Sequence, residues 1–321
     1  MFEHTNADFE HALRRTLRPG IEWPTVLMIA ACHVVWLAAG LLYAATPWVA
    51  VALLAIAIAL HSSLQHEAIH RHPTRSAGLN EALVFLPLGL LIPYRRYRET
   101  HLAHHVDSRI TDPYDDPETF YWAAEDHRRL PRLARLLLAC NATLLGRMVM
   151  GPAIAAGRFL NAEIRLGLAA RGAEARAWRQ GWALHALGLI PVLAAILVFF
   201  AMPLMTYVAA VYCAMALLGL RGFCEHRWAT ATDARTVIVE RSRLGWLFLN
   251  NNLHLVHHKQ PQLPWYALPA AYRARRSEWL ALNEGYVFTG YRAVLRAFAL
   301  RAKEPVVHPL GSAPLAESRA G

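Results

Sequence analysis

Four long apolar stretches constrain what this chain can fold into more than any other feature. They cover about residues 24–44, 48–65, 182–200 and 203–221. Each is close to the roughly 20 apolar residues that a helix needs to cross about 30 Å of hydrocarbon. Short breaks at Pro47 and Pro203 join them in pairs, because proline does not continue a helix. The sequence therefore predicts an all-α integral membrane protein with four transmembrane helices in two hairpins.

Composition supports a single membrane domain rather than two soluble ones. The chain is 55% hydrophobic and 17% charged, below the roughly 25% charged residues of soluble domains. We expect one domain over residues 1–305, in which a cytoplasmic helical cap accompanies the spans. Residues 306–321 are rich in Pro, Ser, Ala and Gly, which predicts a disordered tail.

The positive charge of +10 is distributed in a way that favours a membrane over nucleic acid. Arginines such as Arg14, Arg15, Arg95 and Arg96 stand beside the apolar stretches, where the lipid bilayer offers anionic headgroups. A docking surface for an acidic electron carrier is a compatible alternative. The short turns inside each hairpin lack Lys and Arg, so the positive-inside rule predicts cytoplasmic termini and a cytoplasmic central segment, 66–181.

One part of this central segment mixes apolar residues with arginines. Residues 133–168 contain Arg135, Arg147, Arg158 and Arg165 among many leucines and alanines. This mixture predicts one or two amphipathic helices that lie at the membrane surface.

Histidines gather in three short clusters at residues 66–70, 101–105 and 254–258. On a helix, residues three and four apart share a side, so each cluster can direct two or three imidazoles toward one metal region. Imidazole suits zinc, copper, nickel and iron. The second and fourth stretches end on the same side of the bilayer, and His226 follows the fourth as the first cluster follows the second. We therefore expect the clusters to converge.

The clusters have the forms HxxxH, HxxHH and HxxHH, and in these the chain resembles the membrane fatty-acid desaturase and hydroxylase superfamily from about His61 to Tyr266. The resemblance implies two non-haem iron ions that activate O2 for attack on an unactivated C–H bond. It also implies one further histidine near the end of the last span, which His226 matches. The implied iron ligands are His66, His70, His101, His104, His105, His226, His254, His257 and His258.

Polar residues near these histidines are candidates for orienting them. Glu67, Glu99 and Glu225 could accept a ring N–H, or could pair with an arginine instead. Some family members use an Asn to hold a water; Asn250, four residues before His254, could do so or could cap a helix. The four residues that directly precede His226, 222–225, include no Asn, which puts a water-holding Asn on that helix in doubt.

A group of acidic residues between the second cluster and the amphipathic segment has a plainer prediction. We expect Asp112, Asp115, Asp116 and Glu118 to cap turns, with contact to a polar headgroup as the alternative.

The function that follows most directly is an O2-dependent fatty-acyl or acyl-lipid desaturase, because removal of hydrogen from a methylene needs an oxidant stronger than any side chain. A hydroxylase or ketolase of a lipid, carotenoid or hydrocarbon remains open, as does a desaturase of a small amino-acid-like metabolite. A metal-binding membrane transporter or sensor would place ligands inside the spans rather than at their ends. The sequence contains no dinucleotide or Rieske motif, so we expect a separate ferredoxin or cytochrome donor with its reductase.

Overall fold

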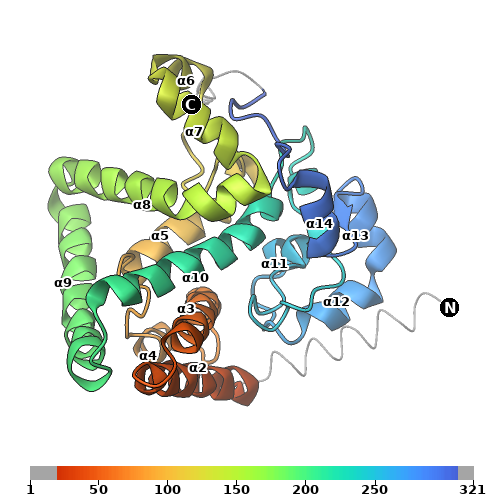
Figure 1. Ribbon diagram of the computed structural model, residues 1–321. Helices are drawn as coiled ribbons and strands as arrows, with labels where there is room; N and C mark the ends of the chain where they lie inside the picture. The colour runs from red at the N-terminus through yellow and green to blue at the C-terminus, as the bar shows by residue number, and fades with distance from the viewer. Residues whose placement is uncertain (1–19, 310–321) are drawn as a thin grey trace.

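A computed structural model describes residues 20–309, so Arg14, Arg15 and most of the predicted tail lie outside the described residues. The described chain is mostly helical (Figure 1). Its α-helices are α2 (Trp23–Leu42), α3 (Pro47–Ile69), α4 (Ala77–Leu83), α5 (Tyr94–His104), α6 (Ala124–Arg129), α7 (Arg132–Asn141), α8 (Leu144–Ala169), α9 (Gly172–Ala194), α10 (Leu204–Glu225), α11 (His254–Lys259), α12 (Leu268–Ala274), α13 (Arg276–Leu282) and α14 (Tyr291–Phe298). Short elements are η1 (Asp107–Arg109), the π-helical turn η2 (Ala195–Phe199), η3 (Asp233–Arg235) and the strands β1 (Ile238–Val239) and β2 (Val287–Phe288).

Four helices within the described residues are long and apolar enough to cross a membrane, as the sequence predicts. They are α2, α3, the continuous helix formed by α9 with η2, and α10. Proline stands at the start of α3 and directly before α10, where a missing N–H costs nothing because the first N–H groups of a helix have no partner within it. The prediction of an all-α membrane fold with four spans is confirmed.

Three of the spans are longer than the apolar stretches that predict them. The helix α3 continues to Ile69 and α10 to Glu225, so each ends directly before a histidine of the predicted site, His70 and His226. The helix α9 begins at Gly172 rather than near residue 182. The apolar stretch predicts a later start because the first turns of the helix carry Arg176 and Arg179.

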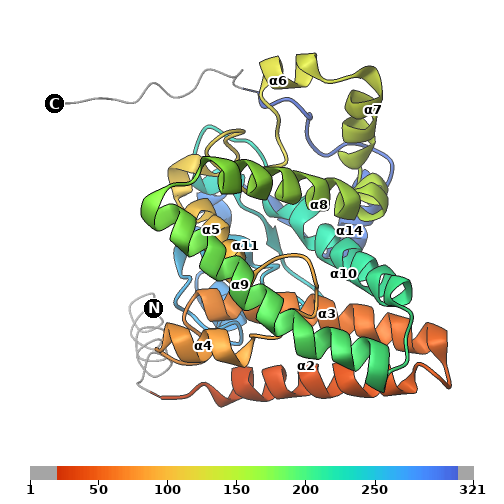
Figure 2. The same ribbon diagram turned by 90° about the vertical axis from the view of Figure 1, so that its left-hand side faces the viewer.

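The core of the membrane region lies around α3. This helix packs against α2 on one side and α10 on the other, and Figure 2 shows α2 and α3 running side by side. Trp36 of α2 donates from Nε1 to the Tyr207 hydroxyl of α10 at 2.8 Å, and that hydroxyl donates to the Leu88 carbonyl at 2.9 Å. α10 also packs against α8, whereas α9 packs against α5.

The C-terminal third of the described chain forms a compact unit beside the histidine end of the spans, drawn in blue in Figure 1. Its β1 and β2 pair in parallel, with Ile238 opposite Val287 and Val239 opposite Phe288. Val306 and His308 bond to the backbone of Trp122, so the first residues of the predicted tail pair with the segment that precedes α6.

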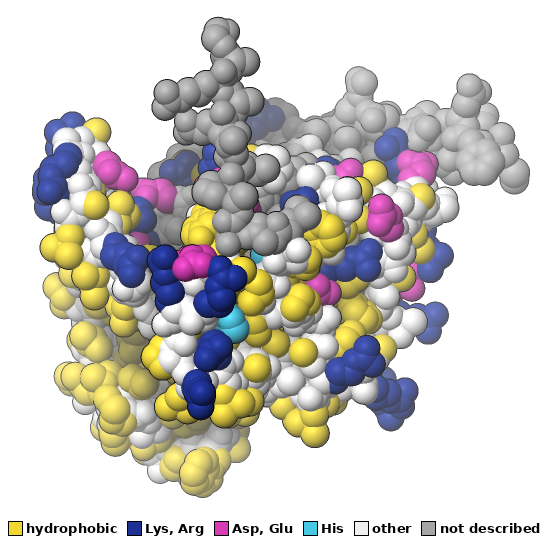
Figure 3. Space-filling model, turned by 90° about the horizontal axis from the view of Figure 1, so that it is seen from above, with side chains coloured by type: hydrophobic (Ala, Val, Ile, Leu, Met, Phe, Trp, Pro, Cys, Tyr) yellow, Lys and Arg dark blue, Asp and Glu magenta, His cyan; other side chains and the backbone are white. Residues whose placement is uncertain are grey.

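Charged side chains are unevenly spread over the surface. Figure 3 shows charged side chains across the upper part and down the centre and right of its view, while the lower left part is formed by hydrophobic side chains. Large apolar residues of the spans, such as Trp48, Phe199 and Met205, are 88, 71 and 70% exposed. Such a surface suits lipid rather than water, and the chain is a multi-pass membrane protein by these helices.

Candidate metal centre

The structure brings all nine predicted histidines together in two neighbouring groups. In each group, one ring nitrogen from every histidine lies within 4.8 Å of the corresponding nitrogens of the others. The five-histidine group contains His66, His70, His101, His105 and His257, and the four-histidine group contains His104, His226, His254 and His258.

Helical spacing explains how the two HxxHH clusters serve both groups. His101 and His105 are four residues apart and point into the five-histidine group, while His104 between them points into the other. In α11 the same spacing sends its first and last histidines to the four-histidine group and the middle one to the five-histidine group. Residues three and four apart lie on adjacent but distinct lines of a helix face, so each cluster divides between two metal positions.

The remaining ligand positions come from helix ends. α3 supplies His66 from its last turn and His70 as the residue that follows it, both to the five-histidine group. His226 follows α10 with extended backbone angles, φ −129° and ψ 150°, and reaches the four-histidine group. The polar extensions of these two spans thus place imidazoles where the membrane helices end.

The imidazoles face one another through the nitrogen atoms that a metal would use. In the five-histidine group, the Nε2 atom of His101 lies 3.0 Å from the Nε2 atoms of both His70 and His105. In the four-histidine group, the Nε2 atom of His226 lies 3.0 Å from that of His104 and 3.1 Å from that of His254. A neutral imidazole has one lone-pair nitrogen and one N–H. Several Nε2 atoms that converge on one point are therefore better placed to bind a shared cation than to hydrogen-bond with one another.

Two further observations fit bound metal. The His66 Nε2 atom is buried and has no hydrogen-bond partner within the described residues. The rings of His105 and His258, one from each group, stack with their centroids 4.2 Å apart, so the two groups share a wall. A donor set of imidazoles without thiolates suits iron, zinc, copper or nickel. The residues present therefore fit a pair of adjacent metal ions.

Hydrogen bonds from outside orient several of the rings. The Nδ1 atoms of His104 and His254 donate to the side-chain oxygens of Asp116 at 2.8 Å and Asn251 at 2.9 Å. The Nδ1 atom of His101 likewise donates to Glu118 at 2.9 Å. An acceptor on Nδ1 fixes the tautomer and turns Nε2 toward the metal position.

Electrostatic surroundings divide the histidines as well. Burial, reinforced by neighbouring His101 and His104, lowers the pKa of His105 to about 3. Burial also disfavours the charged form of His104, but the carboxylates of Glu118 and Asp116 raise its pKa to about 9. His105 is therefore neutral without metal, as a ligand must be, whereas His104 has the negative surroundings that stabilise positive charge.

The comparison with known protein families gives a clear result. Residues 43–290 match the family model described as fatty acid desaturase. This chain belongs to the fatty acid desaturase family. A search of curated proteins finds no match. Together with the two histidine groups, membership supports an oxidoreductase of the desaturase or hydroxylase type.

In this desaturase-family protein, three of the four predicted orienting residues have other partners. Glu67 accepts the backbone N–H of Trp265 at 3.1 Å, and Asn250 donates to the Trp265 carbonyl at 3.0 Å. Glu99 pairs with Arg96 rather than with a histidine. Glu67 and Asn250 thus hold the segment around Trp265 against α3 and the turn before α11, while Glu99 makes a pair within α5.

The fourth predicted residue, Glu225, remains close to the site. Its Oε1 atom lies 3.8 Å from the His254 Nδ1 atom, but its nearer partner is Arg221 at 2.7 Å. The orienting role next to His254 belongs to Asn251, the neighbour of the predicted Asn250. Asn250 has a positive φ of 56°, and the turn it makes presents Asn251 to the ring three residues later.

The acidic segment needs a correction as well. Asp112 caps a turn as predicted, since its carboxylate accepts the backbone N–H groups of Tyr114 and Asp115. Asp116 also caps turns as predicted, since its carboxylate accepts the N–H groups of Thr111 and Glu118, and it orients His104 in addition. Glu118 orients His101 instead. The spacing between these carboxylates and their histidines follows no helical period. The only sequence signal for them was that they follow an HxxHH cluster, whose rings need acceptors.

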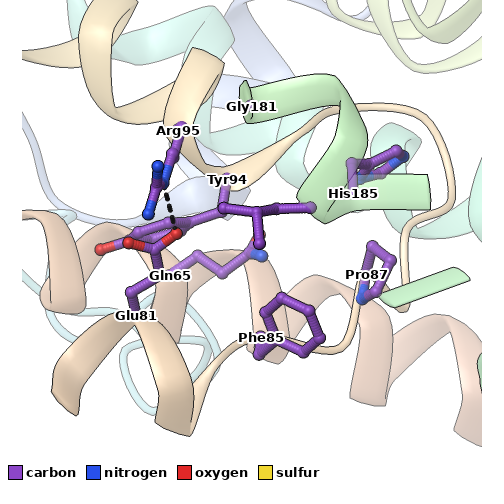
Figure 4. A pocket seen from close by; sticks show the side chains of 9 residues that line it. Gln65, Glu81, Phe85, Pro87, Tyr94, Arg95, Gly181 and His185 are labelled. Carbon is purple, nitrogen blue, oxygen red and sulfur yellow. Dashed lines mark hydrogen bonds and ion pairs between the residues drawn. The ribbon is translucent and has the colours of Figure 1, made fainter. Parts of the chain in front are cut away.

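A pocket lies beside the first cluster, between α3, α4, α5 and α9 (Figure 4). Phe85, Pro87 and Leu184 form apolar parts of its wall. Arg95 and Glu81, paired at 2.7 Å, form its charged part. Gln65, which also lines it, directly precedes His66. The pocket thus combines apolar and polar surface beside the last turns of α3.

Proposed function

We propose that this membrane protein is an O2-dependent di-iron oxidase, and that it is a fatty-acyl or acyl-lipid desaturase. The observation that carries the proposal is the pair of adjacent imidazole groups, five and four strong, that share the wall between His105 and His258. Membership of the fatty acid desaturase family supports iron as the metal and an acyl chain as the substrate.

Bound iron would supply, with O2 as co-substrate, an oxidant strong enough to remove hydrogen from a methylene group. The chain's own residues hold and enclose that chemistry. Asp116, Glu118 and Asn251 keep three rings in their orientation from outside. Buried Leu64 of α3 and buried Phe248 belong to the apolar core of the span region, which helps to keep water from the site.

The partners follow from the same reading. We propose that the histidine groups and both termini lie on the cytoplasmic side, since basic residues concentrate there and the turns between paired spans carry none. The substrate reaches the site from the bilayer. A ferredoxin or cytochrome with its reductase supplies electrons from the cytoplasm.

Lipid analysis of cells that express the chain tests this function. Cells expressing the wild-type chain, supplied with a ferredoxin and its reductase, should accumulate a more unsaturated acyl lipid only when O2 is present. The His104→Ala variant should give none, while His127→Ala, a substitution on α6 away from both groups, should retain the product.

Other products would redirect the proposal. A hydroxylated or keto lipid, carotenoid or hydrocarbon would make the chain a hydroxylase or ketolase. An unsaturated small metabolite with unchanged lipids would move the substrate out of the membrane. Metal uptake across the membrane without any oxidised product would favour a transporter.

A further inference from the structure

The turn between α7 and α8 exposes a row of large apolar side chains outside the four spans. We call residues 132–149 the α7–α8 elbow. On α7, Leu133, Leu136 and Leu137 are 66, 60 and 41% exposed, and on α8, Leu145 and Val149 are 41 and 66% exposed. The three leucines of α7 stand three and four residues apart, so they form one face of that helix. The elbow therefore has an apolar face that no described part of the chain covers.

The elbow is attached to the interior of a membrane span rather than to its end. The Tyr212 hydroxyl of α10 donates to the Val149 carbonyl. Tyr212 is the ninth of the 22 residues of α10. At 1.5 Å per residue it therefore lies about 12 Å from the Leu204 end and about 20 Å from the Glu225 end, which is the histidine end. Either way, the bond lies at a depth that is hydrocarbon in a bilayer about 30 Å thick.

A second contact confirms how closely the two helices approach. A Cβ atom placed on Gly219 of α10 would lie 3.6 Å from the Arg147 carbonyl oxygen of α8. Figures 1 and 2 both show the start of α8 beside α10. The same side of α10 exposes Tyr212 itself, 38% accessible, and Val208, 40% accessible, is exposed one turn away. The apolar face of the elbow is thus continuous with span surface that lipid must cover.

The polar end of the elbow is basic. Exposed Arg132 begins α7, and Arg128 and Arg129 precede it on α6, where both pair with Glu125. Arginines at the end of an apolar helix face reach back toward lipid headgroups while their stems stay in apolar surroundings. This distribution matches an element that enters the bilayer obliquely from its surface.

We propose that the α7–α8 elbow is embedded in the bilayer, with lipid acyl chains covering its apolar face. It enters the bilayer from the histidine end of α10, reaches the depth of Tyr212 about 20 Å along that helix, and does not cross the membrane. The sequence predicts helices that lie at the membrane surface here; the contact with Tyr212 places them deeper. This proposal stands on the packing of α8 against α10 and does not depend on the reaction that the site performs.

The helix that begins in the elbow, α8, is connected to the metal centre through α5. Farther along α8, the buried Glu163 carboxylate accepts from the Arg96 Nε atom of α5 at 3.0 Å, and from the Trp178 Nε1 atom of α9 at 2.9 Å. The helix that contacts lipid at one end thus anchors, at the other, the helix that supplies His101, His104 and His105.

Spin-label accessibility in the full chain, reconstituted in phospholipid nanodiscs, tests the embedding. The two exposed cysteines, Cys140 and Cys213, are first replaced by serine. A nitroxide is then attached in the separate variants Leu136→Cys and Leu145→Cys. The reference variants are Val208→Cys on the lipid face of α10 and Glu125→Cys on α6.

The proposal predicts that labels at 136 and 145 collide with O2 in preference to a water-soluble nickel chelate, as the label at 208 does. Collision mainly with the nickel chelate, as at 125, would overturn it by placing the elbow in water. An immobile label that neither reagent reaches would also overturn it, because protein rather than lipid would then cover the face. Metal content equal to that of the unlabelled chain shows that each variant is folded.

Discussion

The two histidine groups use the same side chain but support it differently. In the four-histidine group, two of the rings have buried side-chain acceptors: Asp116 accepts from His104 and Asn251 accepts from His254. In the five-histidine group, His101 has Glu118, whose side chain is 33% exposed. The group with fewer imidazoles is therefore the one whose imidazoles are held more firmly.

The backbone repeats this difference. The Lys303 ammonium donates to the carbonyl of His226 itself, and to the Tyr286 hydroxyl at 2.8 Å, so the C-terminal segment fixes a residue of the four-histidine group. A metal site with fewer protein ligands leaves room for another ligand, as catalytic metal sites generally do. Because the four-histidine group has fewer ligands and firmer support, we expect it to fix the position of its metal ion more strictly than the five-histidine group does.

The largest expected effect separates the two groups by ligand loss. His254→Ala and His257→Ala should each reduce product formation to background. His254→Ala should release more metal, because the four-histidine group has no spare ligand. Metal analysis of both purified variants checks this, and greater loss from His257→Ala would reverse the assigned difference.

A second substitution should affect both groups alike. Glu163→Gln removes the buried carboxylate that pairs with Arg96, and breaking such a buried pair costs about 3–5 kcal/mol of unfolding free energy. Since α5 supplies both groups, metal should be lost from each in equal proportion. Thermal unfolding in detergent measures the first effect and metal analysis the second.

The control for this variant is Glu99→Gln. Glu99 also pairs with Arg96, but its side chain is 47% exposed, and exposed pairs contribute about 0–1 kcal/mol. If Glu99→Gln destabilised the protein as much as Glu163→Gln, the anchor of α5 would not be the contact with α8.

A smaller effect compares the two orienting carboxylates. Loss of such a partner typically costs about 10–100-fold in metal affinity or activity. Asp116→Asn should weaken metal binding by close to 100-fold and Glu118→Gln by close to 10-fold, about the two limits of that range, because water can replace the partly exposed Glu118 as an acceptor. Metal titrations of the purified variants measure both, with Asp112→Asn as a turn-capping control that leaves metal affinity unchanged.

The smallest effect concerns neighbouring asparagines. Asn251→Ala removes a neutral acceptor from His254, which should weaken metal binding by about 0.5–1.5 kcal/mol. Asn250→Gly keeps the positive φ of that residue and should leave metal affinity unchanged. Equal metal affinity in the two variants would remove Asn251 from the support of the four-histidine group.

The parts of this structure that follow a period could be predicted from the sequence. Apolar stretches of span length gave the four membrane helices, and histidines three and four residues apart gave converging clusters. The start of α9 escaped because its first turns carry Arg176 and Arg179. Asp116 and Glu118 escaped because irregular backbone after η1 brings them back to α5, and no spacing rule describes such a path.

The division of nine histidines into five and four also required coordinates. Helical spacing shows that HxxHH splits between two directions, but not which direction in α5 meets which in α11. Likewise, the choice of Asn251 over Asn250 depends on a turn in which Leu249 and Asn250 both have positive φ. Local pattern therefore fixed the elements and their ligand types, while tertiary packing decided the partners.

Iron analysis with Mössbauer spectroscopy of the chain, purified from cells grown with enriched iron, tests the central claim most directly. Two adjacent groups with different ligands predict about two iron ions per chain and two spectral components of equal area. One iron per chain, a single mononuclear component, or zinc in place of iron would contradict the account.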